Sequence, residues 1–344
     1  MDLLSEILNR IDQQKIISII GLAKNVSKTT TLNFIIRNIG EQITLGITSI
    51  GRDGEKYDVI TELPKPQIYV KKGTYVVTAQ QCYEESQIKF EIIQKTGFNT
   101  PLGEIMILKA LSEGYIELAG PSINKHLMII CLELRKLGCD LILVDGAFDR
   151  RAYATPLISD ATILSTGASV SRNMNEVINL TAHTINLLNL EQEKNLEIKK
   201  LSKILLNESK VSIIDKNNKI HSLNVATALD SAYNISANLD DDSQYVIING
   251  AVTDKLLEGL MKSTQKYKGI TFLVEDGTKL FLSQNTTKKF LKKGGILKVL
   301  NPINIIAITI NPTSPYGYEF DKNKFLKSLQ EKLKIPVYNL GVND

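Results

Sequence analysis

A loop near the N-terminus has the residue types of a phosphate-binding site. Residues 19–33 read IIGLAKNVSKTTTLN, so an apolar run leads into small and polar residues, then Lys-Thr-Thr, then an amphipathic stretch. Successive backbone N–H groups and a helix N-terminus can bind phosphate oxygens without one side chain for each oxygen. This arrangement of strand, loop and helix is typical of a P-loop and predicts binding of a nucleoside triphosphate.

Side chains at the end of the loop would complete this site. We expect Lys28 to reach the β- and γ-phosphates, the hydroxyl of Thr29 to hold Mg²⁺, and Thr30 to contact the α-phosphate. The residues expected around the nucleotide are Gly21, Lys24, Asn25, Val26, Ser27, Lys28, Thr29 and Thr30. The expected cofactors are ATP and Mg²⁺, because the sequence contains no N-K-x-D motif that would read guanine.

The loop departs from the pattern G-x-x-x-x-G-K-[ST] at two points. Gly21 lies seven residues before Lys28 instead of six, a longer loop like that of the dethiobiotin synthetase and cobyrinate amidase relatives of the class. Ser27 takes the place of the usual glycine. If that position needs a positive φ, the serine Cβ costs about 1 kcal/mol, which would reduce nucleotide affinity or reshape the loop. The alternative is an ordinary strand-to-helix turn that contains Lys-Thr-Thr.

A second part of the site is expected at the end of a neighbouring strand. Residues 141–147 read LILVDGA, in which four apolar residues end at Asp145. This is the usual form of a Walker B strand, whose carboxylate holds Mg²⁺ directly or through water. Gly146 would let a phosphate or a water molecule approach closely. The alternative is that Asp145 is a capping or turn residue.

Two further loops could contribute to the site. Residues 48–58 (TSIGRDGEKYD) form a polar loop in which Asp53 is the expected switch residue near Mg²⁺ or substrate and Arg52 a contact to the γ-phosphate. Lys28 and Asp53 are therefore the expected catalytic side chains, and the expected metal ligands are Thr29, Asp53 and Asp145. Residues 119–122 (AGPS) could bind a second anion at a helix start. Surface and strand-to-helix turns are the alternatives for these two loops.

Composition excludes several classes of protein. The 344 residues are 43% hydrophobic and 23% charged, and their net charge of +4 comes from scattered basic residues with acidic neighbours. A dedicated nucleic-acid binder is therefore not expected. Apolar runs such as residues 16–22 are too short to cross a membrane, and the first residues lack the basic start of a signal peptide, so we expect a cytoplasmic protein without membrane contact. Three separated cysteines and three histidines argue against disulfides and structural zinc.

Continuous apolar runs alternate with expected helices, which predicts an α/β fold. Runs at residues 15–20, 43–47, 105–108, 141–144 and 161–164 are apolar on both faces, as in a parallel sheet that helices cover on both faces. Expected crossover helices are residues 31–39, 80–95 and 123–137, and one long helical stretch covers 173–206. We therefore expect a P-loop NTPase-type domain at 1–190, a helical connector at 191–207 and a second, smaller α/β domain at 208–344.

The order of these motifs resembles one known family. The sequences GLAKNVSKTTTLN, TSIGRDGE, AGPS, DGA and NPTSPYGY, which together span about residues 15–320, resemble the small P-loop subunit of the lysine 5,6-aminomutase reactivase. The resemblance implies an accessory protein that, with a MutS-like ATPase subunit, restores an adenosylcobalamin-dependent aminomutase whose cobalamin is damaged. Family members usually have glycine at the position of Ser27, so the departure bears on ATP hydrolysis more than on nucleotide binding.

Other functions stay open from the sequence. An enzyme of the dethiobiotin synthetase kind would use ATP to phosphorylate a carboxylate or carbamate held between Asp53, Arg52 and the turn at 120–122. A nucleotide-binding scaffold without turnover follows if Ser27 disables catalysis. ATPase activity, the nucleotide base and homo-oligomer formation are therefore left to the structure and to experiment.

Overall fold

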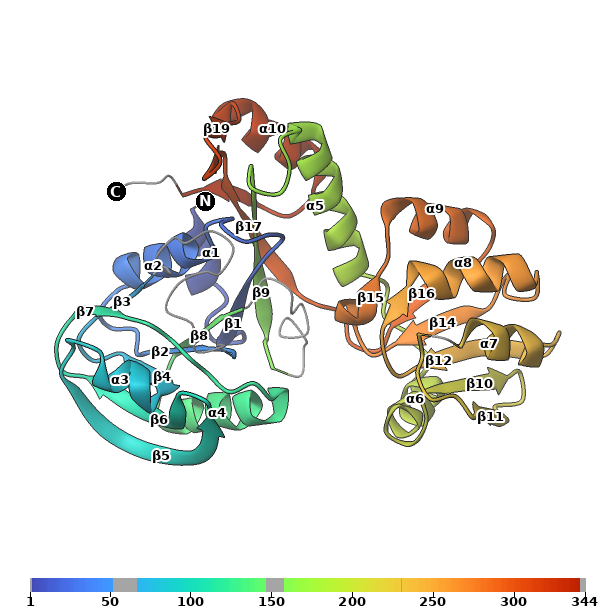
Figure 1. The fold of residues 1–344 in the computed structure, drawn as a ribbon, viewed down its shortest axis with the longest axis horizontal. Coiled ribbons are helices and arrows are strands. Elements are labelled where there is room, and N and C mark those ends of the chain that lie inside the picture. Colours follow the sequence, from blue (N-terminus) through green and yellow to red (C-terminus); the bar gives the residue numbers. More distant parts are fainter. Residues whose placement is uncertain (1, 52–66, 147–157, 230, 341–344) are drawn as a thin grey trace. The chain divides into compact units, whose positions relative to one another are not determined.

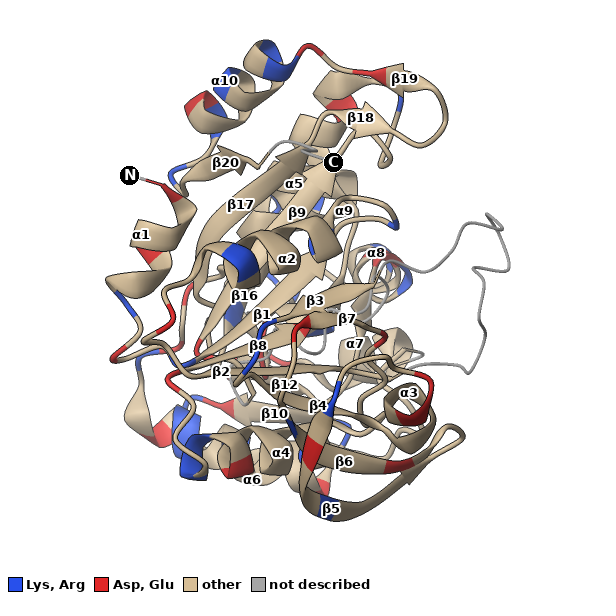
Figure 2. Cartoon of the chain, turned by 90° about the vertical axis from the view of Figure 1, so that its left-hand side faces the viewer, with Lys and Arg blue, Asp and Glu red and all other residues tan. Residues whose placement is uncertain are grey.

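The computed structural model describes residues 2–51, 67–146, 158–229 and 231–340 (Figure 1). The chain divides into two compact units: Met1–Ala182 joins Asn304–Asp344 in the first, and His183–Ile303 forms the second. None of the helices in these ranges has both the length and the apolar composition needed to cross a bilayer. Along α10 (Lys322–Lys332) and α4 (Asn124–Lys136), basic and acidic side chains both occur, so neither helix carries a stripe of one charge (Figure 2).

A nine-stranded sheet forms the centre of the first unit. In spatial order, its strands are β20 (Val337–Asn339), β17 (Ile305–Asn311), β9 (Ala161–Gly167), β1 (Ile16–Gly21), β8 (Leu141–Asp145), β2 (Leu45–Ser49), β4 (Tyr75–Ala79), β6 (Gly103–Ala110) and β5 (Phe90–Thr100). The first seven of these strands are parallel, whereas β6 and β5 run antiparallel to their neighbours. The carboxyl ends of the seven parallel strands therefore meet at one edge of the sheet.

Helices cover both faces of this sheet because successive strand residues point to opposite sides. Ile17 and Ile19 of β1 pack into one core with α1 (Leu3–Leu8) and α2 (Lys28–Asn38). Ile142 and Val144 of β8 pack into another core with α4. Every residue of β1, β2 and β9 is buried, as their continuous apolar sequences predict.

Smaller elements complete the first unit. β3 (Ile68–Val70) pairs antiparallel with β7 (Gly114–Ile116), and β18 (Thr313–Ser314) with β19 (Tyr318–Glu319). α3 (Gln80–Glu84) is a short helix. The sequence predicted a crossover helix at 80–95, and this was wrong beyond α3, because the chain turns back into the antiparallel strands β5 and β6 at the sheet edge.

The second unit has a five-stranded sheet. Its strands in spatial order are β11 (Ile220–Leu223), β10 (Val211–Asp215), β12 (Ser243–Ile248), β14 (Thr271–Val274) and β16 (Ile296–Val299), the last three being parallel. Ile247 and Leu273 pack with α6 (Leu196–Glu208), and the opposite face packs with α8 (Asp254–Ser263) and α9 (Gln284–Lys292). The remaining elements are α7 (Ala232–Asn238), a 3₁₀ turn at Gly277–Lys279, and the paired strands β13 (Val252–Thr253) and β15 (Leu280–Phe281).

Two boundaries differ from the sequence expectation. The expected helix at 173–206 is two helices, α5 (Met174–Leu188) and α6, since Asn195 caps α6 by accepting hydrogen bonds from the N–H groups of Glu197 and Ile198. Residues 304–344, expected in a domain at 208–344, instead supply β17, α10 and β20 to the first unit. The reason is pairing: β17 lies beside β9, and β20 beside β17.

Candidate functional site

The loop between β1 and α2 (residues 22–27, the β1–α2 loop) has an unusual backbone conformation. Asn25 has a φ of 59° and Ser27 a φ of 64°, and both lie in the left-handed region that non-glycine residues rarely adopt. Among the described residues, Asn218 is the only other non-glycine residue with a positive φ. The position before Lys28 thus has the conformation for which P-loops use glycine, and strain of this kind is often found at binding sites.

Close packing holds the β1–α2 loop over the end of β1. A Cβ on Gly21 would lie 2.6 Å from Cγ2 of Val26 and 2.9 Å from Cδ of Lys28, so the loop and the lysine side chain fold back over this glycine. Strand β9 and the turn after it anchor the loop from the other side. The N–H of Leu22 donates to the carbonyl of Ser165 at 3.0 Å, and Oγ of Ser169 donates to the carbonyl of Asn25 at 2.9 Å.

The first turn of α2 faces this loop without a side-chain cap. Ser27 is the N-cap residue, and its side chain makes no capping hydrogen bond. No acidic residue occurs in the first turn either. Backbone N–H groups at a helix N-terminus carry a partial positive charge and bind anions. This end of α2 can therefore serve as an anion site, with the charge of Lys28 beside it.

Asp145 lies at the end of β8, directly beside β1, the strand that leads into the β1–α2 loop. It is in register with Ile19 of β1 on one side and with Ser49 of β2 on the other. The residue keeps part of its surface in solvent, but its Oδ1 atom is buried and has no hydrogen-bond partner among the described residues. Burial raises the pKa of Asp145 to about 6, and the charge of Lys28 acts in the opposite direction. The structure thus brings Lys28 and Asp145 into one electrostatic environment.

The turn at 119–122 packs against the end of β2. A Cβ on Gly120 would lie 1.6 Å from the carbonyl oxygen of Ser49, so only glycine permits this approach. The N–H of Gly51 donates to the carbonyl of Pro121 at 3.1 Å. These contacts explain the glycine by its close packing against the end of β2, which favours an ordinary turn. Arg52 and Asp53 lie outside the described residues.

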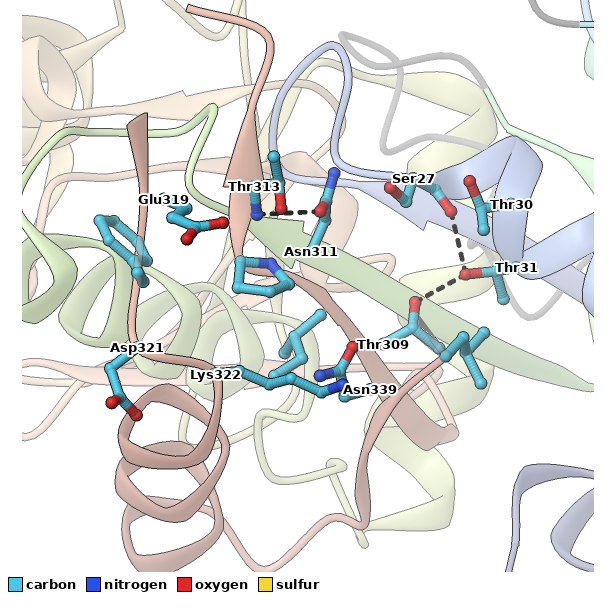
Figure 3. A pocket seen from close by; sticks show the side chains of 14 residues that line it. Ser27, Thr30, Thr31, Thr309, Asn311, Thr313, Glu319, Asp321, Lys322 and Asn339 are labelled. Atoms are coloured by element: carbon cyan, nitrogen blue, oxygen red, sulfur yellow. Dashed lines mark hydrogen bonds between the residues drawn. The ribbon is translucent and has the colours of Figure 1, made fainter. Parts of the chain in front are cut away.

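A cavity of about 450 Å³ opens beside the first turn of α2. Figure 3 shows Ser27, Thr30 and Thr31 on one side of it and Glu319 and Asp321 on the other. The remaining lining residues come from the ends of β17 and β20, the β18–β19 hairpin and the start of α10: Thr309, Ile310, Asn311, Pro312, Thr313, Phe320, Lys322, Asn339 and Leu340. The cavity therefore continues from the β1–α2 loop along the edge of the sheet.

Turn chemistry shapes the wall of this cavity. Oδ1 of Asn311 accepts a hydrogen bond from the N–H of Thr313 at 3.0 Å, and the N–H of Phe320 donates to the carbonyl of Pro312 at 2.9 Å. Tyr318 anchors the hairpin through its hydroxyl, which donates to the carbonyl of Ala168 at 2.6 Å. The tyrosine-containing loop NPTSPYGY is thus a folded hairpin with one side on a cavity.

The expected site residues that the structure describes come from two separate segments of the chain. Gly21, Lys24, Asn25, Val26, Ser27, Lys28, Thr29 and Thr30 occupy the end of β1, the β1–α2 loop and the first turn of α2. Asp145 joins them through strand pairing. Sequence reasoning missed Glu319 and Asn339 because it assigned them to another domain, whereas Asn311 entered it through the NPTSPYGY motif. The signal that could have found Asn339 is its position at the end of a strand.

Metal binding at this site would depend on the ligand. Within the described ranges, no three His, Cys, Asp or Glu side chains come together as a metal site. Mg²⁺ in nucleotide sites usually takes only one or two carboxylates and completes its coordination with phosphate oxygens and water. The buried Oδ1 of Asp145 and the Thr29 hydroxyl fit that pattern.

Comparison of the chain with protein-family models, with curated proteins and with solved structures gives no match, so the geometry of the site carries the functional argument.

Proposed function

We propose that this chain binds a nucleoside triphosphate with Mg²⁺ at the N-terminus of α2. The observation that carries the proposal is the buried Oδ1 of Asp145, which has no hydrogen-bond partner in the described part of the chain and lies in the field of Lys28. A buried carboxylate is costly unless a cation or a donor compensates it. Asp145 would hold a magnesium ion, whose positive charge would supply that compensation.

Each group in the site has a distinct proposed role. The N–H groups of the β1–α2 loop and of the first turn of α2 would bind phosphate oxygens, and Lys28 would neutralise the terminal phosphates. The hydroxyl of Thr29 and the carboxylate of Asp145 would hold Mg²⁺. When bound, the ion supplies neutralisation of phosphate charge. The left-handed Ser27 supports this assignment, because it turns the loop at the position where P-loops curve around the β-phosphate.

The cavity beside α2 would take the nucleoside half of the ligand. Ser27 and Thr30 line this cavity and also belong to the proposed phosphate site, so one molecule can occupy both. Pro312, Phe320 and Leu340 supply apolar surface for a base, while amide, hydroxyl and carboxylate groups line the rest. Apolar walls with a few polar groups are usual in sites for cofactors of this size.

A titration that separates the two halves of the ligand tests this proposal. Calorimetry of the full chain measures the affinities for Mg-ATP, Mg-GTP, inorganic triphosphate with Mg²⁺, and adenosine. Triphosphate reports on the β1–α2 loop alone, and adenosine on the cavity alone. We expect Mg-ATP to bind more tightly than either half, because the two sites share one wall. Equal, weak binding of all four ligands would contradict the proposal.

We further propose that nucleotide binding serves the reactivation of an adenosylcobalamin-dependent aminomutase. The ordered resemblance of the sequence to the small reactivase subunit supports this role, with a MutS-like ATPase as partner. Releasing a spent corrinoid from a tight complex requires a protein that binds open and closed mutase with different affinities. The ATP-bound and ADP-bound states of this chain must then differ in their affinity for the mutase or the ATPase, because equal affinities shift nothing.

An activity-recovery assay tests the second step. Aminomutase inactivated by turnover is incubated with fresh adenosylcobalamin, ATP and the MutS-like ATPase, with and without this chain, and a pull-down with ATP or ADP follows complex formation. We expect activity to recover only when the chain is present. We also expect the pull-down to show a complex whose formation depends on the bound nucleotide. Equal recovery without the chain, together with no complex, would contradict the role and favour an ATP-dependent enzyme of the dethiobiotin synthetase kind.

A further inference from the structure

Three buried hydroxyl groups form a chain beneath the β1–α2 loop. Oγ of Ser165 on β9 lies 2.8 Å from Oγ1 of Thr309 on β17, and Oγ1 of Thr309 lies 2.9 Å from Oγ1 of Thr31 on α2. Oγ1 of Thr31 then donates to the carbonyl oxygen of Ser27 at 3.1 Å. Figure 3 shows the last two links, which end at the residue before Lys28. All three hydroxyl-bearing residues are buried.

The hydrogen bonds between these hydroxyl groups all run in one direction. Each hydroxyl has a single proton to donate. Since Thr31 gives its proton to the Ser27 carbonyl, Thr309 must donate to Thr31, and Ser165 must donate to Thr309. Hydrogen bonds aligned in this way polarise and strengthen one another. The hydrogen bond to the Ser27 carbonyl is thus strengthened by hydroxyl groups on two strands of the sheet, β9 and β17.

The Ser27 carbonyl, which accepts the last of these hydrogen bonds, determines where the N–H of Lys28 points. The carbonyl of Ser27 and the N–H of Lys28 belong to one planar trans peptide, so they point in opposite directions. The carbonyl is directed into α2, where it accepts hydrogen bonds from both the N–H of Thr31, at 2.9 Å, and the Thr31 hydroxyl. The N–H of Lys28 is therefore directed out of the helix N-terminus, toward the proposed phosphate position.

We infer that Thr309 is a positioning residue for phosphate binding, which it serves through Thr31 and the Ser27 peptide. The inference rests on the proposed nucleotide site and adds a residue that lies 278 positions from Thr31 in the chain. Thr309 also lines the cavity proposed for the nucleoside. One side chain thereby connects the wall of the cavity with the peptide that presents the Lys28 N–H.

The variant Thr309→Val tests this inference, because it removes the hydroxyl at nearly constant volume. We expect the affinity for Mg-ATP to fall roughly fivefold, the usual size of one lost hydrogen bond. Thr309→Ser keeps the hydroxyl and should restore the affinity. In the ligand-free protein, hydrogen exchange at the Thr31 amide, which bonds to Ser27, should become faster in the valine variant only.

Thr181→Val is a matched control. Oγ1 of Thr181 donates to the carbonyl of Val177 at 2.7 Å and lies 2.9 Å from Oγ1 of Thr166, so this pair of buried hydroxyls repeats the pattern of Thr31 and Thr309 on α5, a helix that does not follow the β1–α2 loop. It should lower the stability to urea about as much as Thr309→Val while leaving Mg-ATP affinity and Thr31 exchange unchanged.

The possible outcomes separate the two proposals. Unchanged Thr31 exchange in Thr309→Val overturns the inference, whether or not nucleotide binds. Equal losses of affinity in Thr309→Val and Thr181→Val also overturn it, because the effect would then be general destabilisation. Faster Thr31 exchange in Thr309→Val, found together with a wild-type protein that fails to bind Mg-ATP, would support the positioning of the Ser27 peptide and contradict the proposed function.

Discussion

Replacing Asp145 with asparagine should stabilise the ligand-free protein at neutral pH and weaken its binding of a magnesium nucleotide. The carboxylate is held at the end of β8 with a buried Oδ1 that accepts no hydrogen bond within the described residues. Its negative charge is therefore costly without a ligand. Asparagine has nearly the same shape and no charge, so the cost disappears together with the proposed metal ligand. Sites that bind ligands commonly give up stability in this way.

The size of the stabilisation follows from the pKa of Asp145, which burial raises from 3.8 to about 6. Below pH 3.8 the carboxyl is neutral in both states and costs nothing. Between pH 3.8 and 6 the folded protein keeps a proton that the unfolded chain has lost, so the free energy of unfolding falls as the pH rises. Above pH 6 the full cost is present, at most about 3 kcal/mol for a pKa that rises from 3.8 to about 6.

Urea unfolding of the ligand-free protein at pH 4 and pH 7.5 measures this effect, and Mg-ATP titrations with and without excess EDTA measure the metal dependence. We expect Asp145→Asn to match the wild type at pH 4, to exceed its stability at pH 7.5, and to lose the Mg²⁺-dependent part of nucleotide affinity. Asp12→Asn, at an exposed aspartate of the same unit, is the control and should change neither quantity. An Asp145→Asn protein that is less stable than the wild type at pH 7.5 would refute the reasoning.

Two further predictions concern the β1–α2 loop. Lys28→Ala should weaken Mg-ATP binding at least tenfold, about 1.4 kcal/mol, with little change in the Tm of the ligand-free protein, and the exposed Lys125→Ala serves as its control; unchanged affinity would argue against the phosphate site. Ser27→Gly should raise nucleotide affinity or turnover by up to about fivefold, because glycine adopts the φ of 64° without the cost of a Cβ; a decrease in both would mean that the serine hydroxyl itself contacts the ligand.

Local patterns were sufficient to identify the elements that carry the proposed phosphate site. The apolar run before Gly21 and the amphipathic run after Lys28 are β1 and α2 in the structure, and the run before Asp145 is β8. The sequence placed the loop and the carboxylate on separate strands of a mixed α/β fold with a large, mostly parallel sheet, and the pairing of β1 with β8 confirms their adjacency. Strand and helix signals of this kind are local, which is why they could be read from one sequence.

Long-range pairing explains what the sequence did not reveal. β17 and β20 have the same apolar texture as the strands of the second unit, so composition could not tell which sheet they join. Only their pairing beside β9 brings Thr309 and Asn311 near α2. The hydroxyl chain from Ser165 to Ser27 likewise depends on three segments that are far apart in sequence, and no local pattern marks its members.

The most direct test of the proposed phosphate site is the electron density of the protein crystallised with a non-hydrolysable ATP analogue and Mn²⁺. The account predicts triphosphate density at the N–H groups of Lys28 and Thr29, the base in the cavity beside Asn311, and an anomalous Mn²⁺ peak between the phosphates and Asp145. An analogue bound elsewhere, or a Mn²⁺ peak with no contact to Asp145 or to the phosphates at α2, would contradict it.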